Sequence, residues 1–451
     1  MSPLGAMLPD IVTAVPGPRS MALAERLRGV ESRNVTHLSH DFPVFWEEAL
    51  GANVRDVDGN VYLDFTAAFG VALAGHAHPT ITDRIHDQAE RLVHGMGDVH
   101  PSRLRVELLE RVAAFSPWPD ARVVLASTGS EAVEIALKTA ELATGRSGIL
   151  SFQGAYHGLT LGSLAAVARP YFKEPFQRRI FEGVAFAPFP TEGALADSLA
   201  AVEEALKTGA PGGQPIGAVI VEPIQGRAGV RIPAEGFLTA LVELAHQAGA
   251  LVIFDEVFTG FGRTGATFAF EHEGVAPDLL CVGKALGGGL PLSACLGSEI
   301  MMSAWPESTG EALHTSTFLG HPLSCASALA FLDVMQNENL IERGGALGSE
   351  IADRLRGALE DTVGVAEIRA RGLFIGVELA VVGGGPLEGG GAEVAAAALS
   401  RGLLVLPAGE EGHVVELSPP ATLTSDQAEV GVGLLVEAIH AVLEPAPGGS
   451  P

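Results

Sequence analysis

One lysine of this chain stands in surroundings unlike those of the other three. Lys138, Lys173 and Lys207 lie beside glutamate or within polar helical patterns, as solvated lysines do. Lys284 instead follows the apolar run DLLCV and precedes alanine, leucine and three glycines. Burial among apolar groups lowers the pKa of a lysine amine, which makes the amine more nucleophilic near neutral pH. The position therefore indicates that Lys284 reacts with a substrate or a cofactor.

Two other features could place a cofactor beside this amine. Asp255 ends the apolar stretch LVIFD, and a buried carboxylate is unfavourable unless it has a partner. The segment STGSEA (Ser127–Ala132) has the small residues and the helix start that suit a phosphate. Each feature alone is also typical of an ordinary helix cap or ion pair. Together with Lys284 they match pyridoxal phosphate (PLP), because the lysine can form a Schiff base while the carboxylate keeps the pyridine nitrogen protonated.

A series of short strands and helices must position these residues. Apolar segments alternate with helical patterns over the middle of the chain, which predicts a mostly parallel sheet with helices on both faces. The predicted strands read ARVVLAS, GILSF, GAVIVEP, LVIFDEV and DLLCVGK. Helical patterns appear in GSEAVEIALKTAELA, GFLTALVELAHQAG and PLSCASALAFLDVMQ. Open parallel sheets bind ligands beyond the carboxyl ends of their strands, which is where we expect Asp255 and Lys284.

The rest of the chain predicts a second, smaller α+β domain. Residues 1–75 are expected to form an N-terminal arm and a hairpin, with its turn at Asp58–Gly59, that pack with this small domain. Residues 76–325 would form the large cofactor-binding domain, and residues 326–451 the small C-terminal domain. The glycine-rich segment Val381–Glu393 is predicted to be a loop, and the final PAPGGSP a frayed tail.

The composition argues against several classes of function. With a net charge of −26, the chain has no cationic surplus for nucleic acid or an anionic membrane. Cys281, Cys295 and Cys325 lack the paired spacing of a disulfide framework, and no His or Cys spacing predicts a metal site. The N-terminus lacks the pattern of a signal peptide, and no apolar run approaches the ~18 residues of a membrane helix. A cytoplasmic, acidic, globular protein is the expectation.

Six segments, taken together, resemble the motif series of the class III (ω-type) PLP-dependent aminotransferases, which have fold type I. They run in order from about Gly51 to Thr424 and read ASTGSEAVEIALKTA, FQGAYHG, VIVEPIQG, LVIFDEVFTGFGRTG, CVGKALGGGLP and HTSTFLGHPLSCA. The resemblance implies an α/β fold with a large domain, built on a mostly parallel sheet flanked by helices, and a small α+β domain. It also implies a homodimer whose two active sites are shared between the subunits.

The resemblance further assigns roles to the residues around the cofactor. Lys284 and Asp255 are the catalytic residues that it implies. The implied cofactor-binding residues are Gly129, Ser130, Tyr156, His157, Glu222, Asp255, Val257, Lys284 and Thr317. Among them, Gly129 and Ser130 bind the phosphate, and Thr317 reaches a phosphate from the neighbouring subunit. Tyr156 stacks on one face of the ring and Val257 packs on the other.

Near the substrate, the sequence differs from the best-known members of the family. Leu159 follows the YHG motif, where the γ-aminobutyrate and acetylornithine enzymes carry an arginine that grips a carboxylate. Arg227 and Glu416 stand where the family has glutamate and arginine, so the charges of this gatekeeper pair are exchanged. Phe258 replaces a glutamine that reaches the cofactor, and Phe69 lies by position near the substrate. Phe69, Arg227 and Glu416 are thus the predicted substrate-binding residues, and classical γ-aminobutyrate specificity is not expected.

Three hypotheses for the function follow. The leading one is an aminotransferase (EC 2.6.1.-) that moves an amino group from an amine or amino acid to a 2-oxo acid by ping-pong kinetics through Lys284. The alternative keeps the fold and cofactor but is an amino-acid racemase, 2-epimerase or aminomutase, in which the proton returns to Cα. A third is a PLP-binding or regulatory protein without catalysis, and the intact set of Lys284, Asp255 and phosphate residues argues against it. The sequence does not identify the amine donor.

Overall fold

The computed structural model describes residues 4–40, 42–191 and 193–443. Within this part of the chain, no helix is both long enough and apolar enough to cross a membrane. Over the same residues, no three His, Cys, Asp or Glu side chains group as ligands for a metal ion. The predicted tail PAPGGSP lies outside the described residues.

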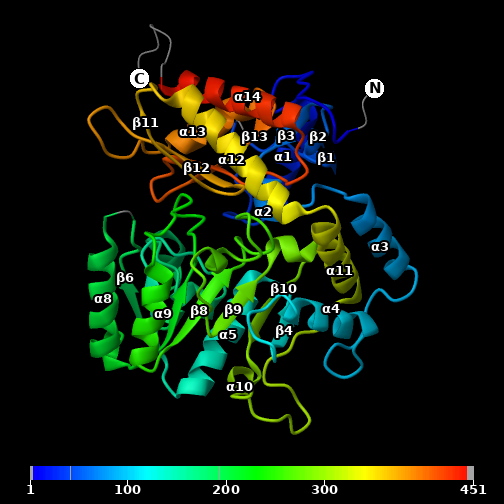
Figure 1. Ribbon diagram of the computed structural model, residues 1–451. Helices are drawn as coiled ribbons and strands as arrows, with labels where there is room; N and C mark the ends of the chain where they lie inside the picture. Colours follow the sequence, from blue (N-terminus) through cyan, green and yellow to red (C-terminus); the bar gives the residue numbers. More distant parts are fainter. Residues whose placement is uncertain (1–3, 41, 192, 444–451) are drawn as a thin grey trace. The chain divides into compact units, whose positions relative to one another are not determined.

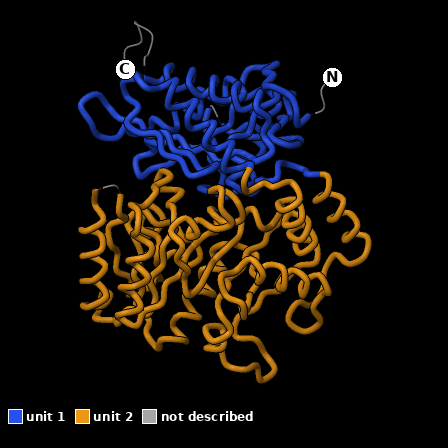
Figure 2. The backbone as a smooth tube through the Cα atoms, in the orientation of Figure 1, with its two compact units in different colours: residues 1–78, 343–451 blue, residues 79–342 orange. Residues whose placement is uncertain are grey.

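The chain divides into two compact units (Figure 2). The larger unit is residues 79–342, and the smaller unit joins residues 1–78 to residues 343–451. The second boundary thus follows Glu342 and does not fall near residue 325, where the sequence predicted it. The reason is helix α11 (Pro322–Asn337), which packs on other helices of the larger unit and is buried along most of its length.

A mixed sheet lies at the centre of the larger unit. Its strands are β4 (Arg122–Ala126), β5 (Gly148–Phe152), β6 (Val184–Ala187), β7 (Ile216–Val221), β8 (Leu251–Glu256), β9 (Leu279–Val282) and β10 (Ser293–Gly297). Their order is β4-β10-β9-β8-β7-β5-β6, and all are parallel except β10, which runs antiparallel to both of its neighbours. The prediction of a mostly parallel sheet is confirmed. Most central strands are buried along their whole length, which explains their continuous apolar runs.

Helices cover this sheet (Figure 1). They are α3 (Pro79–Ala89), α4 (Arg103–Ala113), α5 (Gly129–Thr144), α6 (Leu161–Ala165), α7 (Pro170–Lys173), α8 (Leu195–Thr208), α9 (Phe237–Gln247), α10 (Glu299–Met302) and α11. Helix α5 packs on β9 and β10, directly after β4, so its N-terminus lies at the edge where the parallel strands end. Helices α8 and α9 pack side by side, with α8 on β6 and α9 on β8.

Two small sheets and several helices form the smaller unit. One sheet has the order β1-β2-β3-β13, and the other has the order β11-β12-β15-β14. The strands are β1 (Trp46–Leu50), β2 (Asn53–Asp56), β3 (Val61–Asp64), β11 (Val365–Arg371), β12 (Phe374–Leu379), β13 (Leu403–Leu404), β14 (Leu406–Ala408) and β15 (Val414–Leu417). The helices are α1 (Pro18–Arg28), α2 (Ala67–Gly70), α12 (Leu340–Leu359), α13 (Gly390–Leu399) and α14 (Ser425–Leu443). Helix α13 occupies the end of the segment that the sequence predicted to be a loop.

Hydrogen bonds join the two ends of the chain within the smaller unit. The backbone N–H groups of Gly5 and Met7 donate to Oδ1 of Asn53, at 3.1 and 3.2 Å. The amide nitrogen of Gln427, on α14, donates to the carbonyl oxygens of the same two residues. Because buried polar groups need partners, these bonds tie the N-terminal segment to both the hairpin and the last helix.

Candidate active site

Lys284 and Asp255 lie at the ends of neighbouring parallel strands of the larger unit. Asp255 is near the end of β8 and pairs in register with Cys281 of β9. Lys284 comes two residues after β9 and begins a short 3₁₀ turn, Lys284–Gly287, with a left-handed φ of 43°. Non-glycine residues rarely adopt such angles, and they cluster at functional sites. The structure thus brings the predicted amine and carboxylate to the same edge of the sheet.

The carboxylate of Asp255 is hydrogen-bonded to a histidine. The carboxylate is 7% exposed, and its Oδ2 lies 2.8 Å from Nδ1 of His157. Its Oδ1 accepts a hydrogen bond from the backbone N–H of Val257 at 3.1 Å. Because a carboxylate oxygen only accepts, Nδ1 of His157 carries the proton of this bond. The other ring nitrogen, Nε2, is buried and has no hydrogen-bond partner among the described residues.

Glu222 is a second buried carboxylate in this region. It accepts hydrogen bonds from the backbone N–H groups of Tyr156 at 2.9 Å and Gly226 at 3.2 Å. Burial raises the pKa of the Glu222 carboxyl to about 7, and His157 opposes this shift. Glu222 thereby joins the segment that carries Tyr156 and His157 to the segment that carries Arg227.

The N-terminus of α5 has the geometry of a capping box. Thr128 accepts a hydrogen bond from the N–H of Glu131, and Glu131 accepts one from the N–H of Ser127. A Cβ added at Gly129 would lie 2.8 Å from Cγ1 of Val257, so only glycine allows this close approach. The first N–H groups of a helix have no partner within it and attract anions. This end of α5 can therefore bind a phosphate.

The side chain of Ser130 makes contacts that the sequence did not predict. Its Oγ lies 2.7 Å from Oγ1 of Thr160 and 2.6 Å from Oγ of Ser163, and it accepts a bond from the N–H of Thr160. Thr160 also donates to Glu134 on α5. The hydroxyl of Ser130 therefore orders the segment that follows the YHG motif. Thr160 and Ser163 were missed because a single Thr or Ser in a sequence gives no signal of its hydrogen-bond partners.

Tyr156 is packed between charged and aromatic groups. The guanidinium carbon of Arg227 lies 5.6 Å from the centre of its ring, and the ring of Phe172 meets it edge to face. Burial raises the pKa of the Tyr156 hydroxyl; Arg227 opposes the shift and Glu222 adds to it. Arg227 itself is exposed. The contact is a cation–π interaction that fixes Arg227 beside the predicted ring-stacking residue.

The amine of Lys284 lies over an aromatic ring. Nζ is 3.2 Å from the centre of the ring of Phe258, the residue that stands where the family has a polar one. The negative face of an aromatic ring favours the protonated form of an amine. Phe258 therefore holds the reactive nitrogen by its face and offers no hydrogen bond.

Two of the predicted substrate-binding residues belong to the smaller unit. Glu416 lies in β15 and is 3% exposed, whereas Phe69 is 58% exposed. Phe69 belongs to a turn in which Ala67, Ala68 and Phe69 have φ values of 44°, 48° and 61°. Each left-handed non-glycine residue costs roughly 1–2 kcal/mol. Such a turn persists only if its surroundings hold it in place.

The surroundings that hold this turn contain two residues that the sequence did not point to, Asp64 and His76. Asp64 accepts bonds from Thr66 and from the N–H of Ala68, and it lies 2.7 Å from Nε2 of His76. The available signal was the position of Asp64 at the end of an apolar strand, as for Asp255.

Thr317 lies on the segment between α10 and α11 and is exposed. Nearby, Thr315 donates to Asp98, and His314 contacts Lys138 on α5. The predicted contact of Thr317 with a phosphate of a second subunit stays a prediction.

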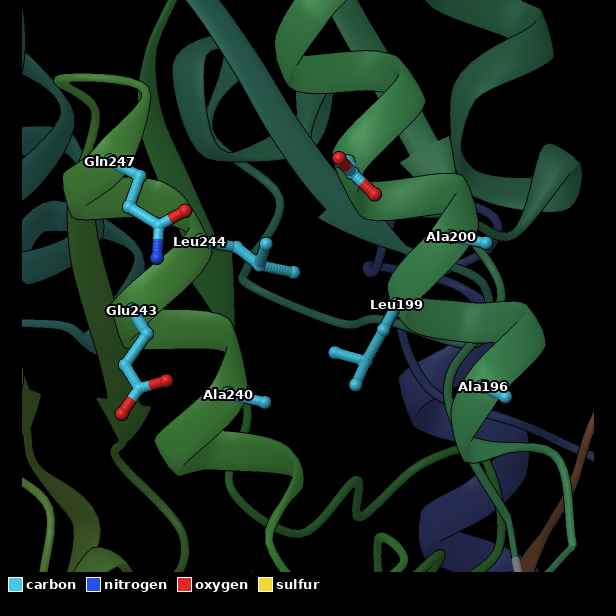
Figure 3. Close-up of a pocket in the computed structure, with 8 residues that line it drawn as sticks. Ala196, Leu199, Ala200, Ala240, Glu243, Leu244 and Gln247 are labelled. Atoms are coloured by element: carbon cyan, nitrogen blue, oxygen red, sulfur yellow. The ribbon is translucent and has the colours of Figure 1, made fainter.

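A groove of about 370 Å³ lies elsewhere, between α8 and α9 (Figure 3). Small and apolar residues line it, with Glu203 and Glu243 at its edge. None of the predicted site residues contributes to it.

Comparisons with known proteins agree with this geometry. The family model described as aminotransferase class-III matches residues 35–439. The acetylornithine aminotransferase of Methanothermobacter thermautotrophicus is 38% identical over 393 residues, which is 87% of this chain and 93% of that protein. The 4-aminobutyrate aminotransferase of Mycobacterium leprae is 34% identical over 443 residues, 94% of this chain and 97% of its own length.

Solved structures are similar over the same extent. The ornithine aminotransferase of Toxoplasma gondii superimposes with a TM-score of 0.82 at 30% identity, over 94% of this chain and 95% of that one. An (S)-enantioselective omega-transaminase of Thermomicrobium roseum gives a TM-score of 0.87 at 29% identity, over 94% and 99%.

The chain belongs to the class III aminotransferases, which have PLP fold type I. It is a PLP-dependent aminotransferase, and the racemase or aminomutase alternative is not favoured, since the relatives are aminotransferases. The residues present fit the cofactor. Asp255 is backed by His157 and keeps acceptor capacity for a ring nitrogen, and a helix N-terminus can take the phosphate.

Proposed function

We propose that this enzyme transfers an amino group from a carboxylate-bearing amine or amino acid to a 2-oxo acid, with Lys284 and Asp255 as its catalytic residues. One observation carries the proposal: Lys284 and a histidine-backed Asp255 follow adjacent strands at one edge of the sheet. Bound PLP supplies an electron sink for the carbon that loses its proton. The larger unit therefore carries the chemistry.

The two catalytic residues divide the work. Nζ of Lys284 would act as the general base that removes the proton from Cα of the donor, and then as the general acid that returns this proton to complete the transfer of the amino group. The Asp255 carboxylate holds a proton on the ring nitrogen, and His157 keeps this carboxylate oriented. Phe258 contacts Nζ through the face of its ring.

The remaining cofactor contacts come from residues that the structure packs around this pair. Backbone N–H groups at Gly129 and Ser130 bind the phosphate, while the Ser130 hydroxyl stays with Thr160 and Ser163. Tyr156 covers one face of the ring and Val257 the other. Glu222 fixes the Tyr156 segment through its backbone N–H.

Arg227 is the residue that we propose for the substrate carboxylate. Its guanidinium is exposed and held over Tyr156, so it is both accessible and positioned. Glu416 is proposed as its partner when no carboxylate is bound, and Phe69 as an apolar wall. The names of the relatives, acetylornithine and 4-aminobutyrate aminotransferase, support a donor that carries a carboxylate. Leu159, in place of an arginine, argues against classical γ-aminobutyrate specificity.

A homodimer completes the proposal, with Thr317 of one subunit near the phosphate of the other. Supporting it is an exposed apolar surface on the larger unit, formed by Leu92, Val93, Met96, Val99, Leu313 and Phe318. The rings of His94 and Phe318 lie 5.3 Å apart, so the two segments that carry these residues are neighbours. Exposed apolar patches of this kind mark protein interfaces. The acidic composition agrees with a cytoplasmic enzyme.

A half-reaction tests the proposal. The purified holoenzyme is mixed with single amine donors and no acceptor, and the visible absorbance of the lysine-bound cofactor is followed. Transamination predicts stoichiometric loss of this band and one equivalent of carbonyl product, reversed by a 2-oxo acid. Proton exchange at Cα with inversion and no carbonyl product would contradict it. Borohydride reduction followed by peptide mapping should place the cofactor on the peptide that contains Lys284.

A further inference from the structure

The turn that presents Phe69 is held by a buried network in the smaller unit. The side chain of Asp64 is fully buried at the end of β3. Its Oδ1 accepts from both the N–H and the hydroxyl of Thr66, at 2.7 and 2.6 Å. Its Oδ2 accepts from the N–H of Ala68 at 3.2 Å and lies 2.7 Å from Nε2 of His76. One carboxylate thus binds the residues directly before Phe69.

His76 is itself fixed in place. Its backbone exchanges hydrogen bonds with Gly51, at 2.9 and 2.8 Å, and the ring of Trp46 meets its imidazole edge to face at 5.8 Å. Because Oδ2 of Asp64 only accepts, Nε2 must be the protonated nitrogen of the ring. His76 therefore anchors Asp64 to strand β1 and selects its orientation.

The same turn is joined to the strand that carries Glu416. Ser418, two residues further along the chain, donates from its N–H to the carbonyl of Phe65 at 2.7 Å. Its hydroxyl donates to the carbonyl of Thr66 at 3.0 Å. Hydrogen bonds of Ser418 therefore join the strand of Glu416 to the turn of Phe69, the two predicted substrate residues of the smaller unit.

We propose that Asp64 and His76 are a positioning pair that holds the left-handed turn at residues 66–70 and so fixes where Phe69 meets the amine donor. The inference rests on the proposed function, in which Phe69 forms an apolar wall of the substrate site. Four acceptor contacts on one buried carboxylate are more than a strand end needs. These contacts stabilise the three successive non-glycine residues with positive φ, because without the contacts the turn would relax to ordinary backbone angles.

The variant Asp64→Asn tests the pair, because it keeps the shape but turns one acceptor oxygen into a donor. A matched control is Asp56→Asn: Asp56 is another buried carboxylate of the same unit and accepts from Asp58, Asn60 and Tyr62. Hydrogen exchange on the holoenzyme should show the amides of Thr66 and Ala68 exchanging about tenfold faster in Asp64→Asn than in the control. Equal exchange in both variants contradicts the inference.

Selectivity provides the second readout. For the carboxylate-bearing donors 3-amino-3-phenylpropanoate and 3-aminobutanoate, the ratio of kcat/KM should change in Phe69→Ala, and in the same direction in Asp64→Asn. The double variant should match Phe69→Ala within about twofold, because the two changes act on one contact. Asp56→Asn should leave the ratio as it is in the parent enzyme.

Variants at His76 keep the test sharp if Asp64→Asn folds poorly. His76→Gln retains an N–H donor near the position of Nε2 and should preserve the ratio, whereas His76→Phe should shift it toward that of Phe69→Ala. An unchanged ratio in His76→Phe and Asp64→Asn, with an altered one in Phe69→Ala, overturns the positioning role.

Different outcomes contradict the positioning inference and the proposed function. If Phe69→Ala leaves the ratio unchanged, Phe69 is no apolar wall and the inference is wrong. The half-reaction with other donors then still reports on Lys284. A lysine-bound absorbance that no amine donor decreases in the parent enzyme would instead overturn the proposed function itself.

Discussion

Each unit of this enzyme contains a strand-end aspartate paired with a histidine, and the two pairs differ in how the carboxylate is used. Asp255, near the end of β8, accepts from the N–H two residues ahead and from Nδ1 of His157. Asp64, the last residue of β3, also accepts from the N–H two residues ahead and contacts Nε2 of His76, but it takes two further bonds from its own turn.

The difference shows what each carboxylate can still do. A carboxylate has about four acceptor sites. The contacts of Asp64 fill them, so this residue can only hold the chain in shape. Among the described residues Asp255 makes two such contacts, and its remaining capacity is available to a charged ring nitrogen. The same local motif therefore stabilises a turn in one unit, and in the other it leaves acceptor capacity for the chemistry that we propose.

The largest expected effect comes from removing the amine that we propose acts together with Asp255. Lys284→Ala should lower the rate of the half-reaction by about 10⁴-fold, because both the proton carrier and the covalent attachment are lost. Stopped-flow absorbance with a single donor measures it. Added methylamine should restore part of the rate, and a variant that keeps more than a tenth of the parent rate would remove Lys284 from the mechanism.

The next effect separates the two aspartates directly. Asp255→Asn should lower kcat by about 10²–10³-fold, since a preorganised charge at the reacting ring is lost. Asp64→Asn should lower kcat by less than about tenfold, since it acts only through the position of Phe69. Steady-state kinetics at saturating donor compare them, with thermal unfolding of both variants as the control. Equal losses in kcat would break the comparison.

A smaller effect is expected at the substrate carboxylate. Arg227→Ala should raise the KM for carboxylate-bearing donors by about 30-fold, which corresponds to about 2 kcal/mol and is the low end for a charged contact because Arg227 is exposed. Donors without a carboxylate should be unaffected and serve as the internal control. Arg227→Lys should recover only part of the affinity, because it loses the planar fork. An unchanged KM removes Arg227 from the site.

The smallest effect concerns the pH dependence of stability. Burial raises the pKa of the Glu222 carboxyl from 4.5 to about 7, so between these pH values the folded state binds a proton that the unfolded state releases. Stability from this group therefore falls as the pH rises from about 4.5 to 7. Glu222→Gln should flatten the fall in Tm over this window, as measured by calorimetry. A slope identical to that of the parent enzyme contradicts a shifted Glu222.

The sequence indicates the proposed cofactor site because the parts of this site are local in sequence. Apolar runs of strand length located β8 and β9, and parallel strands of one sheet place their carboxyl ends together, so the sequence alone was enough to single out Asp255 and Lys284. Strand β10 was not predicted, because its antiparallel course between β4 and β9 depends on pairing with strands that a sequence pattern does not show. The contacts of Ser130 were also missed, because a hydroxyl at a helix start suits either a phosphate or a neighbouring side chain.

From the sequence alone we inferred the class of enzyme and proposed Lys284 as its reactive residue, since an isolated lysine, a strand-end aspartate and a helix start in this order have few other uses. Only the tertiary structure decided which buried carboxylates have all their acceptor sites occupied by hydrogen bonds and which have acceptor sites left. It revealed the pairing of Asp64 with His76, the strained turn at Phe69 and the place of Lys284 over Phe258. The physical reason is that the number of hydrogen bonds accepted by a buried carboxylate depends on how the chain folds around it. A pattern of residue types along the sequence does not record this number.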